Sequence, residues 1–253
     1  MIRFEKVTKA LGGRTVLDNI SFEVKPGEMF VIVGPSGVGK SVTLKHMVRL
    51  LTPDSGDVLI DGDSIVDADA DALEHIRERF GYLFQGGALL AWMTVAENVA
   101  FPLLEKTRDT ADEVTVRVEE ALKMVGLEND GDKYPSEISG GMRKRAGLAR
   151  AIIRKPEIVL YDEPTSGLDP VTSRTIDDLM NSLRKTLGMT SVVVTHDLHS
   201  ALSIGTRIAM LNSAGIMDPV TPAEFLESRN ADVQAFLEAQ YITKAGLWER
   251  NRE

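Results

Sequence analysis

The sequence predicts an α/β fold in which a mainly parallel β-sheet is flanked by helices. Three short apolar runs, Met29–Val33, Glu157–Tyr161 and Ser191–Thr195, have the length and β-branched content of buried parallel strands. Segments with helical periodicity separate these runs, and strands that alternate with helices are typical of parallel sheets. The longest interval between these runs separates Met29–Val33 from Glu157–Tyr161, and we expect additional helices in it.

The first sixty residues predict a separate antiparallel sheet. Apolar and polar residues alternate along Ile2–Val7 and Val16–Val24, and Val58–Ile60 is followed by an Asp61-Gly62 turn signal. No repeat or low-complexity linker divides the chain, so we expect both sheets to belong to one folded unit.

Residues from about 86 to 154 predict a mainly helical insert. Thr94 and Glu97 have the spacing of a capping box, which marks a helix start. Later apolar residues recur at helical spacing and predict one buried stripe made of Met142, Ala146, Ala149 and Ile153. Basic residues of the same segment lie mostly off this stripe, so we expect a solvated basic face made of Arg143, Lys144, Arg145, Arg150 and Arg154.

Composition excludes several classes of function. The chain of 253 residues has 29 Lys and Arg against 38 Asp and Glu, and this net charge of −9 argues against nucleic acid as a partner. Cysteine is absent, which excludes thiolate catalysis and disulfides and is compatible with a cytosolic location. The apolar runs are far shorter than the roughly 20 residues that span a bilayer.

The strongest chemical signal is a glycine-rich segment directly after the first predicted parallel strand. Gly34–Ser41 fits the pattern G-x-x-x-x-G-K-[ST], whose backbone N–H groups surround phosphates at a helix start. We expect Lys40 to neutralise the β- and γ-phosphates of ATP and Ser41 to bind Mg²⁺. The predicted nucleotide contacts are Gly34, Pro35, Ser36, Gly37, Val38, Gly39, Lys40, Ser41 and Val42. The alternative is a strand-to-helix turn that binds no nucleotide.

Two carboxylates end the second predicted parallel strand. Asp162 is a candidate Mg²⁺ ligand, and Glu163 is a candidate general base for the attacking water. His196 follows the third strand, where it could contact the γ-phosphate. The alternatives are a solvated turn after a buried strand and a purely structural histidine.

An ordered set of motifs resembles the nucleotide-binding subunits of ATP-binding cassette (ABC) transporters over about residues 1–225. Besides the glycine-rich segment, Asp162-Glu163 and His196, the set includes Gln85, Ile138–Met142 and Ser166–Asp169. The resemblance implies a P-loop ATP-binding core with an antiparallel β-subdomain and an inserted helical subdomain at about 86–154. Residues 226–253 would form a C-terminal helical extension and tail.

The same resemblance implies catalytic roles and a dimer. Lys40, Gln85, Glu163 and His196 would act in ATP hydrolysis, with Gln85 also a Mg²⁺ ligand. Two copies of the chain would enclose two ATP molecules, each contacted by Ser139, Gly140 and Gly141 of the opposite copy, and Asp169 would lie at the seam. Ser139–Gly141 open a predicted helix, so free backbone N–H groups are available for a phosphate there.

Two positions depart from the family pattern. Met142 replaces the usual glutamine after Gly141, which removes one polar side chain but leaves the Ser139 hydroxyl and the glycine amides. Leu11 replaces the aromatic residue that usually stacks on adenine, so we expect little selectivity for ATP over GTP.

Two segments, Gln85–Leu90 and Gly140–Arg150, look like those of the ATPases of Mce/Mla-type lipid-trafficking systems. That resemblance implies a motor on the cytoplasmic face of the inner membrane, bound to permease subunits, with a lipid-binding substrate protein and a small regulatory protein as further partners. The alternatives are the ATPase of a polar-solute importer and a soluble ABC ATPase of cofactor assembly. The short interval between Lys40 and Ser139 has no room for the long coiled coil of repair ATPases.

Two apolar regions remain outside the motifs. Ala88–Met93, with Trp92, either lines the groove that receives a permease helix or belongs to the core of the helical subdomain. Near the C-terminus, a helical stripe is formed by Val233, Phe236 and Leu237. The following Tyr241–Glu253, which contains Trp248, is expected to pack against the second cassette; the alternative is a frayed terminus.

Overall fold

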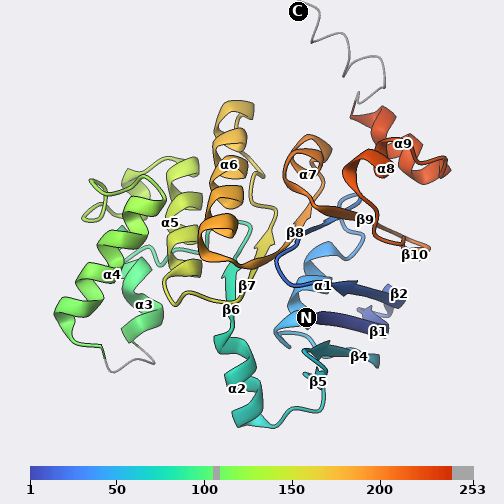
Figure 1. The fold of residues 1–253 in the computed structure, drawn as a ribbon, viewed down its shortest axis with the longest axis horizontal. Coiled ribbons are helices and arrows are strands. Elements are labelled where there is room, and N and C mark those ends of the chain that lie inside the picture. Colours follow the sequence, from blue (N-terminus) through green and yellow to red (C-terminus); the bar gives the residue numbers. More distant parts are fainter. Residues whose placement is uncertain (105–108, 241–253) are drawn as a thin grey trace, which may run out of the picture.

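The chain folds around two β-sheets, with the helices placed on and beside the larger one (Figure 1). The computed structural model describes residues 1–104 and 109–240. The helical insert lies on one side of the larger sheet and the smaller sheet lies on the other. The expected α/β class, with an antiparallel subdomain and a helical subdomain, is confirmed.

The smaller sheet is antiparallel and has the strand order β2-β1-β4-β5. Its strands are β1 (Ile2–Leu11), β2 (Arg14–Val24), β4 (Ser55–Ile60) and β5 (Asp63–Ser64). Strands β1 and β2 are longer than the predicted runs because both continue into a tight hairpin, in which Leu11 pairs with Arg14. The ring of Phe22 stacks on Phe4 at 4.5 Å and on Phe30 at 5.4 Å, so one aromatic column joins this sheet to the larger one.

The larger sheet has the order β10-β9-β3-β8-β7-β6 and is parallel except for β10, which is antiparallel to β9. All three predicted buried strands belong to it. Its strands are β3 (Met29–Val33), β6 (Phe80–Leu83), β7 (Ile158–Asp162), β8 (Thr190–Thr195), β9 (Arg207–Asn212) and β10 (Gly215–Ile216). Every residue of β3, β7 and β8 is buried, as expected for strands covered on both faces.

Helices account for most of the remaining chain. They are α1 (Lys40–Met47), α2 (Ala70–Glu78), α3 (Val95–Leu104), α4 (Ala111–Met124), the 3₁₀-helix η1 (Pro135–Glu137), α5 (Gly140–Ile152), α6 (Pro170–Leu187), α7 (Leu198–Ile204), α8 (Pro222–Leu226) and α9 (Ala231–Ala239). The capping box at Thr94 is confirmed, since the Glu97 N–H donates to Thr94 Oγ1 at 3.2 Å and the Thr94 N–H donates to the Glu97 carboxylate at 2.7 Å. The predicted helical region begins only at Val95, because residues 86–94 form turns.

The expected solvated basic face on α5 is wrong. Lys144 is only 5% exposed, and the other four basic residues are half-buried. Most of them donate hydrogen bonds to backbone carbonyls: Arg143 to Ile138, Arg145 to Val125 and Gly126, and Arg150 to Gly87 and Ala88. Cations on this helix therefore connect it to neighbouring loops instead of facing water. The apolar stripe is confirmed by the burial of Ala146, Ala149 and Ile153.

The C-terminal region continues the main core through α9. Val233 and Leu237 are buried in the same hydrophobic cluster as β3 and β7, and Phe236 packs against it, which confirms the predicted stripe. The predicted contact of Tyr241–Glu253 with a second cassette lies outside the described residues. Within the described ranges, no helix is long and apolar enough to cross a bilayer.

Asp177 introduces a buried carboxyl between α6 and α7. Ser200 Oγ donates a hydrogen bond to Asp177 Oδ1 at 2.6 Å. Burial raises the pKa of Asp177 to about 6, with Asp197 and Asp178 also raising it and the Ser200 bond and Arg174 lowering it. A carboxyl whose pKa is raised by folding destabilises the fold as pH increases from its unfolded pKa to its folded pKa.

We therefore predict that Asp177→Asn stabilises the protein at pH 8 and has little effect at pH 4. The amide removes a buried charge that is present only above about pH 6. The expected gain at pH 8 is roughly 2–3 kcal/mol in the free energy of unfolding, since one pKa unit corresponds to about 1.4 kcal/mol. Urea unfolding at both pH values measures it, with the exposed neighbour Asp178→Asn as control. An equal gain at both pH values would contradict the assignment.

Candidate active site at the carboxyl edge of the central sheet

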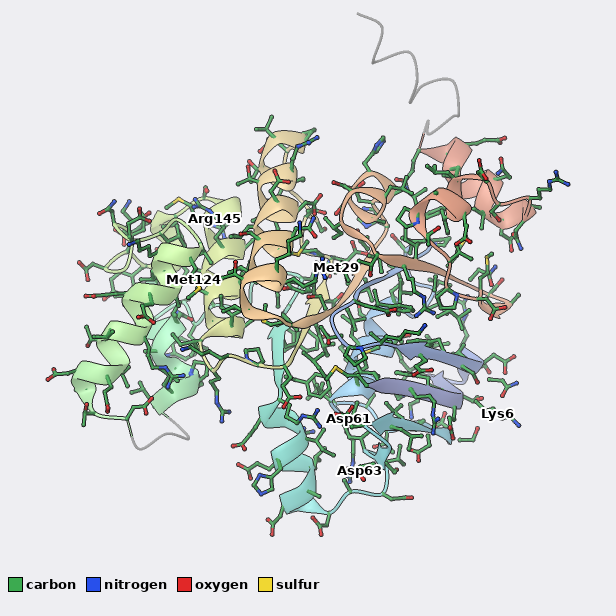
Figure 2. The ribbon with its side chains drawn as sticks, viewed as in Figure 1. Lys6, Met29, Asp61, Asp63, Met124 and Arg145 are labelled. Atoms are coloured by element: carbon green, nitrogen blue, oxygen red, sulfur yellow. The ribbon has the colours of Figure 1, made fainter. Side chains whose placement is uncertain are left out.

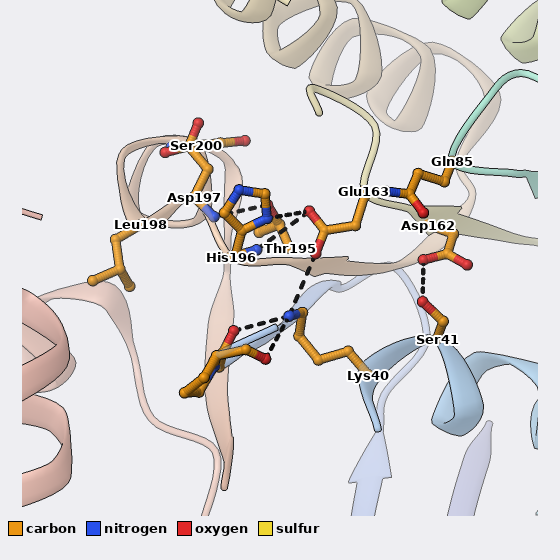
Figure 3. Close-up of polar contacts among 12 residues, drawn as sticks. Lys40, Ser41, Gln85, Asp162, Glu163, Thr195, His196, Asp197, Leu198 and Ser200 are labelled. Carbon is orange, nitrogen blue, oxygen red and sulfur yellow. Dashed lines mark hydrogen bonds and ion pairs between the residues drawn. The ribbon is translucent and has the colours of Figure 1, made fainter. Parts of the chain in front are cut away.

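Register within the parallel sheet brings the predicted catalytic segments together. Val33 pairs with Thr195, and Asp162 pairs with Val194, so β3, β7 and β8 end at one edge. The residues that follow these strands are Gly34, Glu163 and His196. Figure 3 shows Lys40, Glu163 and His196 converging at this edge, with Ser41 and Asp162 beside them. One edge of one sheet therefore carries most of the predicted catalytic groups.

The glycine-rich turn after β3 requires its glycines for steric reasons. A Cβ atom at Gly34 would lie 2.2 Å from the Leu211 carbonyl oxygen. Gly39 has φ +111° at the start of α1, a conformation that L residues rarely adopt, and a Cβ there would lie 2.9 Å from both Leu17 and Val16. The turn wraps around Lys40, whose Nζ donates to the carbonyls of Gly34 at 2.8 Å and Pro35 at 3.0 Å.

Glu163 lies at the centre of the site with both carboxylate oxygens engaged. Its φ of +48° turns the chain away from the strand direction, while its N–H still donates to the Val194 carbonyl at 2.9 Å. Oε1 lies 3.4 Å from Lys40 Nζ, and Oε2 lies 2.8 Å from His196 Nδ1. The carboxylate is buried, so these two partners decide where it points.

Ser41 and Asp162 provide a second polar pair. Ser41 Oγ donates to Asp162 Oδ1 at 2.6 Å. Burial raises the pKa of Asp162, and the Ser41 hydrogen bond opposes that effect. A hydroxyl and a carboxylate that face each other are oxygen ligands suited to a hard divalent cation. Among the described residues, no cluster of three or more His, Cys, Asp or Glu side chains is arranged to hold a metal ion.

Gln85 also lies at this edge. It is exposed and follows β6, which pairs in parallel with β7, and Figure 3 shows it beside Asp162 and Glu163. Ser139 and Asp169 lie outside this cluster. Ser139 caps α5 by accepting from the Met142 N–H at 3.2 Å. Asp169 caps α6 by accepting from the N–H groups of Val171 and Thr172, both at 3.0 Å. Its pKa is lowered mainly by the hydrogen bond from the Thr172 hydroxyl and further by these backbone bonds.

The starts of α5 and α6 lie side by side. A Cβ at Gly141 would lie 2.5 Å from the Thr172 side chain, and one at Gly140 would lie 3.5 Å from Leu168. Ser139 and Asp169 therefore share one exposed surface, and no hydrogen bond or ion pair of the described residues joins them to Lys40 or Glu163.

A cavity lies beside the glycine-rich turn, and Leu11 is not among its lining residues. It has a volume of about 500 Å³ and is lined by residues of the β9–β10 hairpin, α9, Arg14 and Pro35–Val38. Leu11 pairs with Arg14 in the β1–β2 hairpin and is 40% exposed. A larger open concavity of about 890 Å³ lies on the antiparallel sheet, but its lining contains none of the predicted site residues.

Two residues that contact the catalytic segments were not predicted from the sequence. Gln240, which ends α9, donates from Nε2 to the His196 carbonyl at 2.6 Å and accepts at Oε1 from the Leu198 N–H at 2.9 Å. Lys144 donates from Nζ to the carbonyls of Gln85 and Glu163. Gln240 lies outside the sequence motifs, and Lys144, although it lies within Gly140–Arg150, was not predicted to contact the site. Helix packing brings both residues there.

Comparisons with known proteins agree with this geometry. The family model described as "ABC transporter" matches residues 17–166. The chain belongs to the ABC transporter family. This ABC protein therefore binds and hydrolyses ATP, and its hydrolysis is coupled to transport.

Among its curated relatives, this ABC ATPase is 40% identical to the probable ribonucleotide transport ATP-binding protein mkl of Mycobacterium leprae, over 100% of this chain and 73% of the relative. It is 36% identical to the intermembrane phospholipid transport system ATP-binding protein MlaF of Haemophilus influenzae, over 95% and 91% of the two chains.

A solved relative matches the fold and the expected chemistry. The ATP-binding cassette MJ0796, described as a dimer in a post-hydrolysis state bound to ADP and Pi, aligns with a TM-score of 0.80 and 36% identity. The match covers 88% of this chain and 99% of that one. The ABC ATPase fold predicted from the motifs is thereby confirmed.

We predict that Leu11→Tyr tightens ATP binding roughly two- to tenfold, because an aromatic ring adds stacking energy that leucine lacks. The parent protein should bind ATP and GTP with similar affinity. Titration with fluorescent nucleotides measures both, with Leu50→Tyr as a control at another exposed leucine. Equal ATP affinity in parent and Leu11→Tyr would show that the adenine lies elsewhere.

Proposed function

We propose that this ABC ATPase is the motor subunit of a membrane transporter that moves phospholipid or another lipid in the bacterial envelope. Residues 1–225 form its nucleotide-binding domain, and residues 226–253 form a C-terminal extension. It works at the cytoplasmic face of the inner membrane through permease subunits. The observation that carries the proposal is the convergence of Lys40, Glu163 and His196 at one sheet edge.

In the proposed reaction, Lys40 and the N–H groups of Gly34–Val42 bind the phosphates. Lys40 Nζ then leaves Glu163 Oε1, which frees that oxygen to accept a proton from the attacking water. His196 keeps the carboxylate oriented through Oε2. The water oxygen bonds to the γ-phosphorus as the bond to the ADP oxygen breaks, giving ADP and phosphate.

Magnesium is the proposed cation. Ser41 and Asp162 would hold it, and Gln85, which Figure 3 shows beside Asp162, would complete the set. The bound ion would neutralise charge on the β- and γ-phosphates. The fit of this pair to a hard cation supports the assignment, because both groups present oxygen and already face each other.

We infer that the working unit is a dimer with two ATP sites. Ser139–Gly141 and Asp169 share an exposed surface that no catalytic group of the same chain uses. The N-terminus of α5 can bind phosphate through its free N–H groups and positive end. A second copy of the chain would bring these residues to the ATP held by the first.

Lipid as the cargo is supported by the relative that matches nearly end to end. MlaF of Haemophilus influenzae is named for intermembrane phospholipid transport, and the match covers 91% of it. Trp92, which is 73% exposed, is not part of the helical core and lies in the segment after Gln85. An exposed indole is suited to an interface, and we assign it to the permease.

A polar-solute importer is the second candidate. The methionine import ATP-binding protein MetN of Caulobacter vibrioides is 41% identical to this chain over 220 residues. That match covers 86% of this chain and 66% of the relative, which is less of both proteins than the MlaF match covers.

We predict that Glu163→Gln lowers kcat for ATP hydrolysis roughly 100-fold or more, because the amide keeps the shape but cannot accept a proton. ATP binding should persist, and ATP-dependent dimers should accumulate in light scattering. Glu157→Gln, which precedes the same strand and pairs with Arg79, is the matched control and should hydrolyse ATP normally. Unchanged turnover in Glu163→Gln would remove Glu163 from the role of base.

We also predict that Trp92→Glu uncouples or dissociates the complex with its permease while ATP affinity of the isolated subunit stays nearly constant. A buried charge in place of an indole opposes docking. Val116→Glu, at an exposed valine of α4, is the control. Copurification from detergent-solubilised membranes measures the loss of contact.

Reconstitution of the native complex tests the cargo. Labelled phospholipid should move between vesicles or carrier proteins when ATP is hydrolysed. ATPase stimulation by a water-soluble amino acid, with no movement of lipid, would favour the importer instead.

A further inference from the structure

Lys144 is a buried cation that contacts two catalytic segments at once. Its Nζ donates to the Glu163 carbonyl at 2.9 Å and also to the Gln85 carbonyl. Gln85 and Glu163 follow the neighbouring strands β6 and β7. The ammonium group therefore bridges the backbone of the proposed water-activating residue and the backbone of the proposed cation ligand.

Burial makes these contacts obligatory. Removing an ammonium group from water costs several kcal/mol unless its protons find acceptors. Desolvation lowers the pKa of Lys144, and the nearby carboxylates of Asp162 and Glu163 oppose that effect. Lys144 therefore depends on the two carbonyls as acceptors, and the hydrogen bonds fix the ammonium group relative to both.

Lys144 lies in the same N-terminal half of α5 as Ser139. Ser139 caps this helix and Lys144 lies five residues later, about 7.5 Å along the axis. Because helical hydrogen bonds connect this part of the chain, we expect a displacement of Ser139–Gly141 to move the Lys144 backbone with it.

We propose that Lys144 is a positioning residue that couples the location of α5 to the geometry of Glu163 and Gln85. Occupation of the Ser139–Gly141 surface by a phosphate held on a second copy would fix α5, and Lys144 would then align the two carbonyls in its own chain. One ATP site would thus set the hydrolytic competence of the other. This inference rests on the proposed base role of Glu163.

A neighbouring residue offers a matched control. Arg145 follows Lys144 on α5 and also donates to two carbonyls, those of Val125 at 3.0 Å and Gly126 at 2.7 Å. These acceptors belong to the end of α4 in the helical subdomain, where Figure 2 labels Arg145 near Met124. Loss of Arg145 removes a half-buried cation from the same helix and leaves the hydrogen bonds to Gln85 and Glu163 in place.

The experiment compares Lys144→Met and Arg145→Met in the full chain. Lys144→Met should lower kcat for ATP hydrolysis roughly 10- to 100-fold, the effect expected when a catalytic group is displaced by about 1 Å. Its KM for ATP should stay within about threefold, because the phosphate contacts are intact. Arg145→Met should lose thermal stability but keep its kcat. Lys144→Arg, which retains donors and charge, should recover activity relative to Lys144→Met.

A second measurement separates positioning from folding and from the base role. Combined with Glu163→Gln, Lys144→Met should still form ATP-dependent dimers, since binding does not need the two carbonyls aligned. A wild-type kcat in Lys144→Met, or an equal loss of kcat in Arg145→Met, would overturn the proposal. Loss of nucleotide binding and dimers would also overturn it.

If Lys144→Met fails to fold, Lys144→Gln takes its place in every comparison. If the Glu163→Gln single variant hydrolyses ATP, the proposed base role of Glu163 is refuted. The kcat of Lys144→Met relative to Arg145→Met then still decides whether Lys144 positions the site.

Discussion

Parallel pairing of β3, β8 and β7 is the constraint on which the site depends. Val33, Thr195 and Asp162 end their strands at one edge of the sheet. The segments that follow these strands therefore begin close together, and no long loop is needed to bring them into contact. The positive φ of Glu163 turns the chain at the strand end, where its carboxylate reaches both Lys40 and His196. A one-residue slip between these strands would send every side chain to the opposite face and separate the catalytic groups.

The polar side chains of the candidate site form hydrogen bonds and ion pairs with one another and with nearby carbonyl groups. Lys40 is held by two carbonyls and Glu163, while Ser41 is held by Asp162. These contacts satisfy buried polar groups that would otherwise be costly. In the proposed reaction, phosphate oxygens would take the place of the carbonyls at Lys40, and Ser41 and Asp162 would hold the cation. Glu163 Oε1 would then be free to accept a proton from water.

Much of this arrangement follows from the sequence because its signals are local. Met29–Val33 and Gly34–Ser41 specify a strand, a turn and a helix in consecutive residues, and the Thr94 capping box specifies its own helix start. The prediction for Lys144 was wrong because helical periodicity identifies the apolar stripe but not the contacts of the residues beside it. The acceptors of Lys144 lie in the segments that follow β6 and β7, which are distant in sequence. Gln240 was missed for the same reason, since only the packing of α9 on the core brings it to His196.

We propose that ATP displaces Lys40 from Glu163 and separates Ser41 from Asp162 without moving the strands. A structure of the protein with Mg²⁺ and a non-hydrolysable ATP analogue measures both changes. We expect Lys40 Nζ to contact the β- and γ-phosphates, Ser41 and Asp162 both to face the metal ion, and Glu163 to keep its contact with His196 but lose the one with Lys40. Phosphates bound away from Gly34–Val42, or a Lys40–Glu163 ion pair that persists beside bound nucleotide, would contradict it.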